Sequence, residues 1–237
     1  MGQGCAGFRE AYVVHRRSYR ETSLLVDVFS RDQGLLRVLA KGVRRGKSSK
    51  ACLLQPFAAL GLAWTGRGDL PVLVEVESIR RHGLTGSAVL CGLYLNELLV
   101  RLLPVGDPHP ALFAAYGETL ERLARGGGQE PLLRGFELLL LEELGYAPPL
   151  EHEGGSGLPV LAERYYDYRP EHGPVPCPPH PQAFRGTTLL ALSARGLADA
   201  EQLREAKRVM RLIIGHALGG KPLKSRELFK YIKFEAS

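Results

Sequence analysis

Five short segments rich in valine and leucine lie within the first eighty residues, and they restrict the fold more than any other feature. Segments of this kind, separated by turn residues, are typical of β-strands. The turn before the third segment ends in Gly34, which accepts the positive φ that a tight turn needs. Five strands in so short a stretch predict a small β-barrel of the OB type, a fold that commonly binds oligonucleotides. The segments are residues 11–15, 23–30, 35–41, 57–65 and 70–79.

After residue 86 the apolar residues recur at helical spacing. A first helix is expected from Ser87, which suits an N-cap, to the residue before Pro104. The residues at about 146–183 are rich in Pro, Gly and His, although YYDYR at 165–169 suits a short strand. Further helices are expected at about 110–125, 130–144, 184–195, 199–218 and 223–232.

The predicted fold class is therefore α+β. An N-terminal five-stranded OB-type β-barrel occupies residues 1–82. A helical-bundle domain follows at residues 83–237, with an irregular Pro/Gly-rich insertion at about 146–183.

The charge of the chain favours an acidic partner. Lys and Arg number 31 against 25 Asp and Glu, a net charge of +6. Such an excess suits nucleic acid or an anionic membrane surface. The four cysteines show no pairing pattern, no secretory leader is visible, and no run approaches the roughly 20 apolar residues that span a bilayer. We expect a cytoplasmic protein without a membrane partner.

The stretch KGVRRGKSSK at residues 41–50 holds five cations and no carboxylate. It leaves the third predicted strand, while HRRSYR at 15–20 enters the first turn and Arg67 lies in the GRGD turn. Cationic loops on a barrel can bind phosphates, which need charge more than accurate geometry. The alternative is a solubilising loop. The candidate phosphate-binding residues are Arg16, Arg17, Arg20, Lys41, Arg44, Arg45, Lys47, Lys50 and Arg67.

Aromatic residues share the strands and turns that carry these cations. An aromatic ring on an OB surface can stack on a base, but most of these rings are expected to belong to the core. The residues concerned are Tyr12, Tyr19, Phe29, Phe57 and Trp64.

The helix expected at 199–218 carries a second cationic group. Its members are three, four and seven residues apart, so they share one face. This face either binds phosphates or is a solvated surface with local ion pairs to Glu201 and Glu205. The four cations are Arg204, Lys207, Arg208 and Arg211.

No motif indicates a metal site, a cofactor or an enzyme. His172, Cys177 and His180 lie close in sequence, with His152 further away, but zinc usually takes four ligands as two close pairs. Phosphate-binding loops and nucleophile motifs are absent from the sequence. A nuclease would need clustered carboxylates, for which Glu75 and Glu77 are the nearest approach.

Several segments together resemble the RecO family of recombination mediators, in the form that lacks a zinc finger. They include RETSLL, KGVRR, LQPF, LRGFELLLLEELGY and GGKPLKSRELF, and the likeness covers nearly the whole chain. The resemblance implies an OB-fold joined to a helical domain. It also implies binding of single- and double-stranded DNA, annealing of complementary strands, and RecA loading with RecR. Where members with a zinc finger carry two CxxC motifs, this chain reads APPLEHEGGSGLPV.

The resemblance also implies a receptor for the acidic, aromatic-ended tail of the single-stranded-DNA-binding protein SSB. Such a receptor needs an apolar pocket rimmed by cations. Candidates are Arg122, Arg125, Leu133, Arg134 and Phe136, although Arg134 could equally be an ordinary surface arginine. The GGKPLKSR segment adds Lys221, Lys224 and Arg226 to the expected DNA-binding residues. An RNA-binding OB module stays the rival, because the fold does not distinguish RNA from DNA.

Overall fold

The computed structural model describes residues 7–44, 49–66, 68 and 70–235, and the chain divides into two compact units. The first unit comprises Met1–Gly126 and Leu223–Ser237, and the second comprises Gly127–Pro222. The chain therefore leaves the first unit after the barrel and two helices, and returns to it for the last helix. The boundary expected at residue 82 separates strands from helices, whereas the first compact unit contains both.

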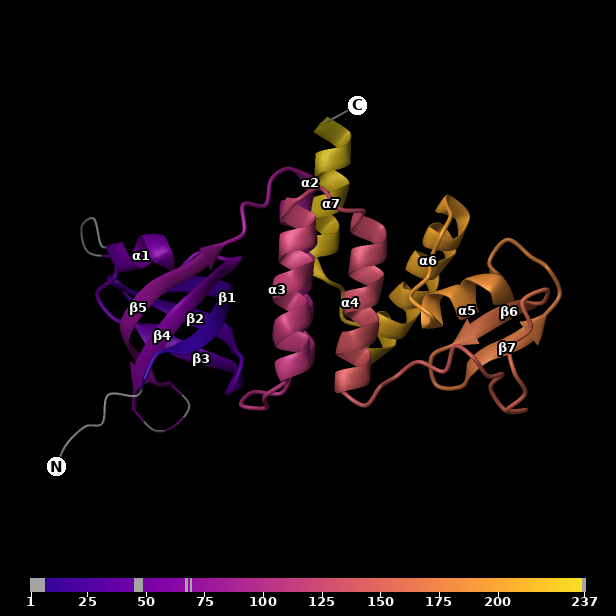
Figure 1. The fold of residues 1–237 in the computed structure, drawn as a ribbon, viewed down its shortest axis with the longest axis horizontal. Helices are drawn as coiled ribbons and strands as arrows, with labels where there is room; N and C mark the ends of the chain where they lie inside the picture. The colour runs from indigo at the N-terminus through magenta and orange to yellow at the C-terminus, as the bar shows by residue number, and fades with distance from the viewer. Residues whose placement is uncertain (1–6, 45–48, 67, 69, 236–237) are drawn as a thin grey trace. The chain divides into compact units, whose positions relative to one another are not determined.

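The N-terminal barrel is closed and has the strand order β1-β2-β3-β5-β4 (Figure 1). Neighbouring strands are antiparallel except β3 and β5, which pair in parallel at Leu39 and Val72. This confirms the predicted five-stranded OB-type barrel. A short helix that the sequence did not predict, α1 (Ser49–Leu53), precedes β4. The strands are β1 (Arg9–Tyr19), β2 (Ser23–Ser30), β3 (Gly34–Ala40), β4 (Ala58–Thr65) and β5 (Val72–Arg81).

Strand β2 shows how the two faces of the barrel wall are used. Its alternate residues Leu24, Val26 and Val28 belong to the apolar core inside the barrel. Phe29 points the other way and packs on Phe113 of the third helix, with ring centroids 5.5 Å apart. Aromatic burial thus joins the barrel wall to a helix of the same unit.

The first unit also contains α2 (Ser87–Leu102), α3 (Pro110–Ala124) and α7 (Lys224–Glu235), and Figure 1 shows α7 alongside α2. The hydroxyl of Tyr116 on α3 donates to Asn96 Oδ1 on α2 at 2.5 Å. The N-cap of α2 is Gly86 and not Ser87, because the helix already begins at Ser87; φ at Gly86 is 53°, a value that favours glycine.

The second unit combines helices with a small sheet of order β7-β6-β8. The predicted strand at 165–169 is confirmed as β6, so the insertion is partly regular. The helix expected from residue 184 begins at Gly186, because Phe184–Arg185 pairs with β6. A Cβ at Gly186 would lie 1.9 Å from the Leu161 carbonyl oxygen, which excludes larger residues. The elements are α4 (Gln129–Glu143), β6 (Tyr165–Arg169), β7 (Gly173–Cys177), β8 (Phe184–Arg185), α5 (Gly186–Ser193) and α6 (Ala200–Ala217).

Among the described helices, none has both the length and the apolar character needed to cross a membrane.

Candidate nucleic-acid interface

Two cationic segments that the sequence places apart meet at one end of the barrel. The Arg44 N–H donates to the Thr22 carbonyl at 2.9 Å, and Arg44 Nη1 donates to the Arg20 carbonyl at 3.3 Å. The Gly42 N–H donates to Ser23 Oγ at 3.4 Å. The segment after β3 is therefore bound to the turn between β1 and β2, so their cations form one group.

The cations of this group differ in how free they are. Arg17 and Lys41 are exposed, and neither side chain has a hydrogen bond or ion pair within the part of the chain that the structure describes. Arg20 is also exposed, and its guanidinium carbon lies 5.3 Å from the centroid of the Tyr19 ring. Three of the predicted residues, Arg45, Lys47 and Arg67, lie outside the described residues.

Two further predicted cations hold the short helix α1 and strand β5 in place. Arg16 Nη1 donates to the Leu54 carbonyl at 3.2 Å, and Lys50 Nζ donates to the Val74 carbonyl at 2.6 Å. A cation at the end of a helix is favourable because the last carbonyls have no intrahelical partner. Arg16 and Lys50 are exposed, yet part of their donor capacity is already used.

Sequence reasoning missed Arg37, which lies on β3, on the outer face that β1, β2 and β3 share. His15, Asp27 and Arg37 form one cross-strand row. Arg37 Nε and Nη2 donate to the two Asp27 oxygens at 2.5 and 3.1 Å, and His15 Nδ1 lies 3.3 Å from Oδ2. The hydrogen bond from Arg37 to Asp27 raises the pKa of Arg37. The alternation in LLRVLA could have revealed it, since Arg37 must face away from the buried Val38.

The aromatic residues near these cations are mostly core, as expected. Tyr12, Phe29 and Trp64 are buried, while Tyr19 and Phe57 are half-buried. Of the five, only Tyr19 combines partial exposure with a neighbouring cation of the barrel turns, Arg20. Among these five rings, Tyr19 is therefore the candidate for base stacking on the barrel.

Half of the predicted cationic face of α6 is engaged within the second unit. Lys207 pairs with Glu130, and Arg208 donates to the Gln182 carbonyl while lying 4.8 Å from the Phe184 ring centroid. Arg204 and Arg211 are exposed, and among described residues they have no hydrogen bond or ion pair. These two alone of the four are free to meet a ligand.

The start of α7 is held by a carboxylate from α2. Glu97 Oε1 accepts from the Lys224 N–H at 2.9 Å, and Oε2 accepts from the Ser225 N–H and Oγ at 2.8 and 2.6 Å. Burial alone would raise the pKa of Glu97, but the hydrogen bonds from Ser225 and Lys224, together with Arg101, lower it. The expected DNA-binding residues Lys221 and Lys224 are exposed here, and Arg226 lies 5.8 Å from the Tyr94 ring centroid.

The residues expected to receive the partner tail fall into two groups. Arg122 and Arg125, in the first unit, are exposed and pair with Glu118 at 3.7 Å and Glu121 at 2.6 Å. In the second unit, by contrast, Arg134 is 5% exposed and pairs with Glu130 and Glu137. Arg134 is therefore not a surface arginine. Leu133 and Phe136 are buried as well.

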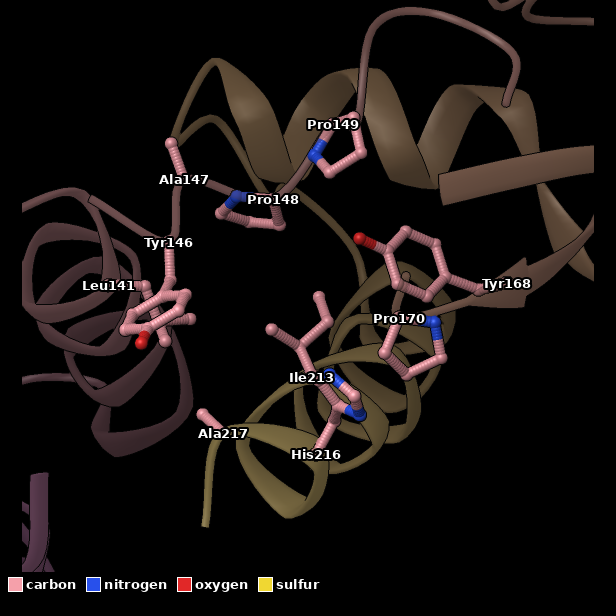
Figure 2. Close-up of a pocket in the computed structure, with 10 residues that line it drawn as sticks. All are labelled: Leu141, Tyr146, Ala147, Pro148, Pro149, Tyr168, Pro170, Ile213, His216 and Ala217. Atoms are coloured by element: carbon pink, nitrogen blue, oxygen red, sulfur yellow. The ribbon is translucent and has the colours of Figure 1, made fainter. Parts of the chain in front are cut away.

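The second unit contains an apolar cavity of about 330 Å³ (Figure 2). Its lining includes Leu141, Tyr146, Ile213 and His216, and no Lys or Arg. Figure 2 shows the Tyr168 hydroxyl pointing toward the prolines at 148 and 149. Burial raises the pKa of Tyr168 well above its usual range, and its oxygen has no hydrogen-bond partner within the described part of the chain.

One group of possible metal ligands exists among the described residues. Asp167, Cys177 and His180 place one ligand atom each within 4.8 Å of one another. His180 Nε2 lies 3.1 Å from Asp167 Oδ1, and His180 Nδ1 accepts the Gln182 N–H at 3.2 Å. Both ring nitrogens are thus already engaged. Glu75 and Glu77, the carboxylates considered for a nuclease, are not part of such a group.

The fold and the site define a class: an OB-type barrel with a cationic end that shares one unit with the helices α2, α3 and α7, joined to a second, mostly helical unit. Comparison with known proteins then specifies the family. A sequence profile described as "Recombination protein O N terminal" matches residues 9–82, and "Recombination protein O C terminal" matches residues 84–227.

Curated relatives agree along nearly the whole chain. "DNA repair protein RecO" of Methylococcus capsulatus is 49% identical over 224 residues, which cover 93% of this chain and 91% of the relative. The protein of the same name from Azoarcus sp. is 44% identical, with 94% of each chain covered. That from Nitrosococcus oceani is 45% identical, covering 94% of this chain and 92% of the relative. The chain belongs to the RecO family of DNA repair proteins, which confirms the resemblance seen in the sequence.

Proposed function

We propose that this protein binds DNA and anneals complementary strands as a recombination mediator, without catalysing covalent chemistry. The observation that carries the proposal is the hydrogen-bonded junction between the β1–β2 turn and the segment after β3, which gathers the barrel cations into one group. The name of the relatives, "DNA repair protein RecO", supports the same process.

The physical demand of annealing suits such a group. Two phosphate backbones repel each other, and cations offset that repulsion without covering the pairing edges of the bases. Arg17 and Lys41 are exposed and free for this purpose, and Arg20 and Arg44 adjoin them. Because the barrel offers few exposed aromatic rings, base contact there is weak, which leaves the bases available for pairing.

The test is annealing of complementary strands coated with SSB, with and without the protein. Arg17→Ala and Lys41→Ala should each make the slope of log affinity against log salt shallower by about 0.7 on single strands. Arg169→Ala is the matched control, because Arg169 is an exposed arginine of the second unit whose side chain has no partner among described residues. No annealing, or unchanged salt slopes in both barrel variants, contradicts the proposal. Competition with a matched RNA strand decides the RNA-binding alternative.

We extend the proposal to the partners: SSB through its acidic tail, RecR, and RecA loading at the nucleoid in the cytoplasm. Two features support a tail receptor, and they are tested separately. Arg122 and Arg125 are exposed cations, and the cavity of Figure 2 offers an apolar lining. An acidic peptide ending in Phe should bind more weakly to Arg122→Glu or to Tyr146→Asp. Unchanged peptide affinity in both variants places the receptor elsewhere.

A further inference from the structure

The second unit contains another cavity, of about 370 Å³, whose chemistry differs from that in Figure 2. It lies between β6, the segment 180–185 and α6, and arginines dominate its lining. Tyr165 and His180 contribute rings, and Glu201 and Glu205 contribute carboxylates. Its three guanidinium groups belong to Arg185, Arg204 and Arg208.

The three guanidinium groups differ in how many of their donors already have a hydrogen-bond partner. Arg208 is fixed by its hydrogen bond to the Gln182 carbonyl and by the Phe184 ring. Arg204 is exposed and has no hydrogen bond or ion pair with any described residue. Arg185 binds Glu201 through Nη1 at 3.0 Å and Glu205 through Nε at 3.2 Å. Its remaining nitrogen, Nη2, is enclosed and lacks an acceptor among the described residues.

The two carboxylates do not neutralise the positive charge of the three arginines. Glu205 is buried, and its oxygens already accept from Arg185 and from Thr188 Oγ1 at 2.5 Å. Glu201 is largely exposed, and its ion pair with Arg185 engages one nitrogen of the arginine, Nη1. Three arginines against two glutamates leave an excess of positive charge, and the unused donors include Arg185 Nη2 and the guanidinium group of Arg204.

We propose that this cavity binds a phosphate oxyanion of a nucleic-acid strand. Guanidinium donors match phosphate oxygens in geometry and charge, and an enclosed donor without an acceptor is satisfied when an oxyanion enters. Tyr165 provides an aromatic face beside the cations, which suits a base next to the bound phosphate. A nucleic acid uses both features, whereas an acidic peptide without an aromatic residue uses only the cations. The inference rests on the proposed function and adds to it a DNA contact in the second unit.

The test uses the full chain and a single-stranded oligonucleotide of thymidines with one 5-iododeoxyuridine. Irradiation should cross-link the modified base to Tyr165, and peptide mapping locates the attachment. Arg204→Gln should lower the yield at Tyr165 about tenfold, the effect of losing one charge-assisted contact. Arg204→Lys should restore part of it. Arg169→Gln is the matched control, because Arg169 is an equally free, exposed arginine of the second unit that does not line the cavity. It should stay near the unaltered yield.

The outcomes separate this inference from the proposed function. If the oligonucleotide fails to bind the unaltered protein at all, the proposed function fails. If it binds without cross-linking to Tyr165, or if both glutamine variants lose yield equally, the inference alone is overturned. Displacement of the cross-link by inorganic phosphate while the oligonucleotide stays bound assigns the site to free phosphate. Displacement by an acidic peptide assigns it to a protein partner. Either displacement overturns the nucleic-acid assignment.

Discussion

Replacing Glu97 with Gln should release the start of α7. One carboxylate accepts three hydrogen bonds there, two of them on Oε2. Gln keeps one oxygen and turns an amide nitrogen, itself a donor, toward groups that also donate. The loss of at least one charge-assisted hydrogen bond costs about 2 kcal/mol. Because about 1.4 kcal/mol is a factor of ten, local opening of α7 should become about 30-fold more frequent.

Amide hydrogen exchange of the full chain measures this opening directly. Peptides spanning residues 221–229 should exchange faster in Glu97→Gln, while barrel peptides should keep their protection. Glu118→Gln is the matched control, because Glu118 is an exposed carboxylate of the same unit that pairs with Arg122 at 3.7 Å. Equal exchange of residues 221–229 in the two variants would refute the argument that Glu97 holds the helix.

The acid dependence of α7 provides a second readout. The pKa of Glu97 is lowered in the folded protein, so its ionised form contributes stability above the ordinary glutamate pKa. That contribution is lost as the pH falls below the ordinary value and through the lowered one. After correction for intrinsic exchange, protection of residues 221–229 should therefore fall with acid in the unaltered protein. In Glu97→Gln it should change little over the same range.

Three further predictions concern other parts of the chain. Gly34→Ala should destabilise the first unit by at least about 2 kcal/mol in urea unfolding, because φ is 63° and a Cβ would meet the Asp107 carbonyl oxygen at 1.9 Å. An unchanged midpoint would contradict this. Arg134→Glu should cost about 3–5 kcal/mol, because it replaces the arginine beside the buried Glu137 with a second carboxylate; a fully folded variant of normal stability would show that the pair is dispensable. Purified protein should contain well under one zinc per chain, and Cys177→Ser should keep its melting temperature. Burial and the nearby Asp167 raise the pKa of the Cys177 thiol and oppose the thiolate that zinc needs; stoichiometric zinc by metal analysis would overturn this expectation.

The sequence predicted most helices and strands well, because the alternation, caps and turns that define them lie within short stretches of the chain. β2 occupies residues 23–30 as expected, since its alternation and its flanking turns lie within one short stretch. Pro110 at the start of α3 and Asp199 at the N-cap of α6 also acted as their types suggest. Asp199 accepts the N–H groups of both Glu201 and Gln202. Phe184–Arg185 was assigned to a helix because its strand partner, β6, lies some twenty residues earlier.

The candidate site was predicted less completely, because a charge in the sequence does not show its partner. Lys207 and Arg204 look alike on a helical wheel, yet Lys207 pairs with Glu130, which is 77 residues away in the chain. The sequence left Arg134 as either a residue of the tail receptor or an ordinary surface arginine, and it is buried beside Glu137. Arg37 was overlooked because it belongs to no cluster of cations in the sequence, although the alternation of its strand places it on the outer face.

The start of α7 also depends on both local residues and a residue far away in the chain. Gly219 and Gly220 end α6 with positive φ, and the next helix begins where Glu97 accepts the N–H groups of Lys224 and Ser225. A carboxylate 127 and 128 residues away thus holds the start of α7 to α2 within the first unit. The cations of the GGKPLKSR segment flank that contact. If they bind DNA, Glu97 positions them without touching the DNA itself. Neutralising Glu97 should then weaken DNA binding through the order of this segment, whereas neutralising Lys224 should weaken it through charge and make the salt dependence shallower.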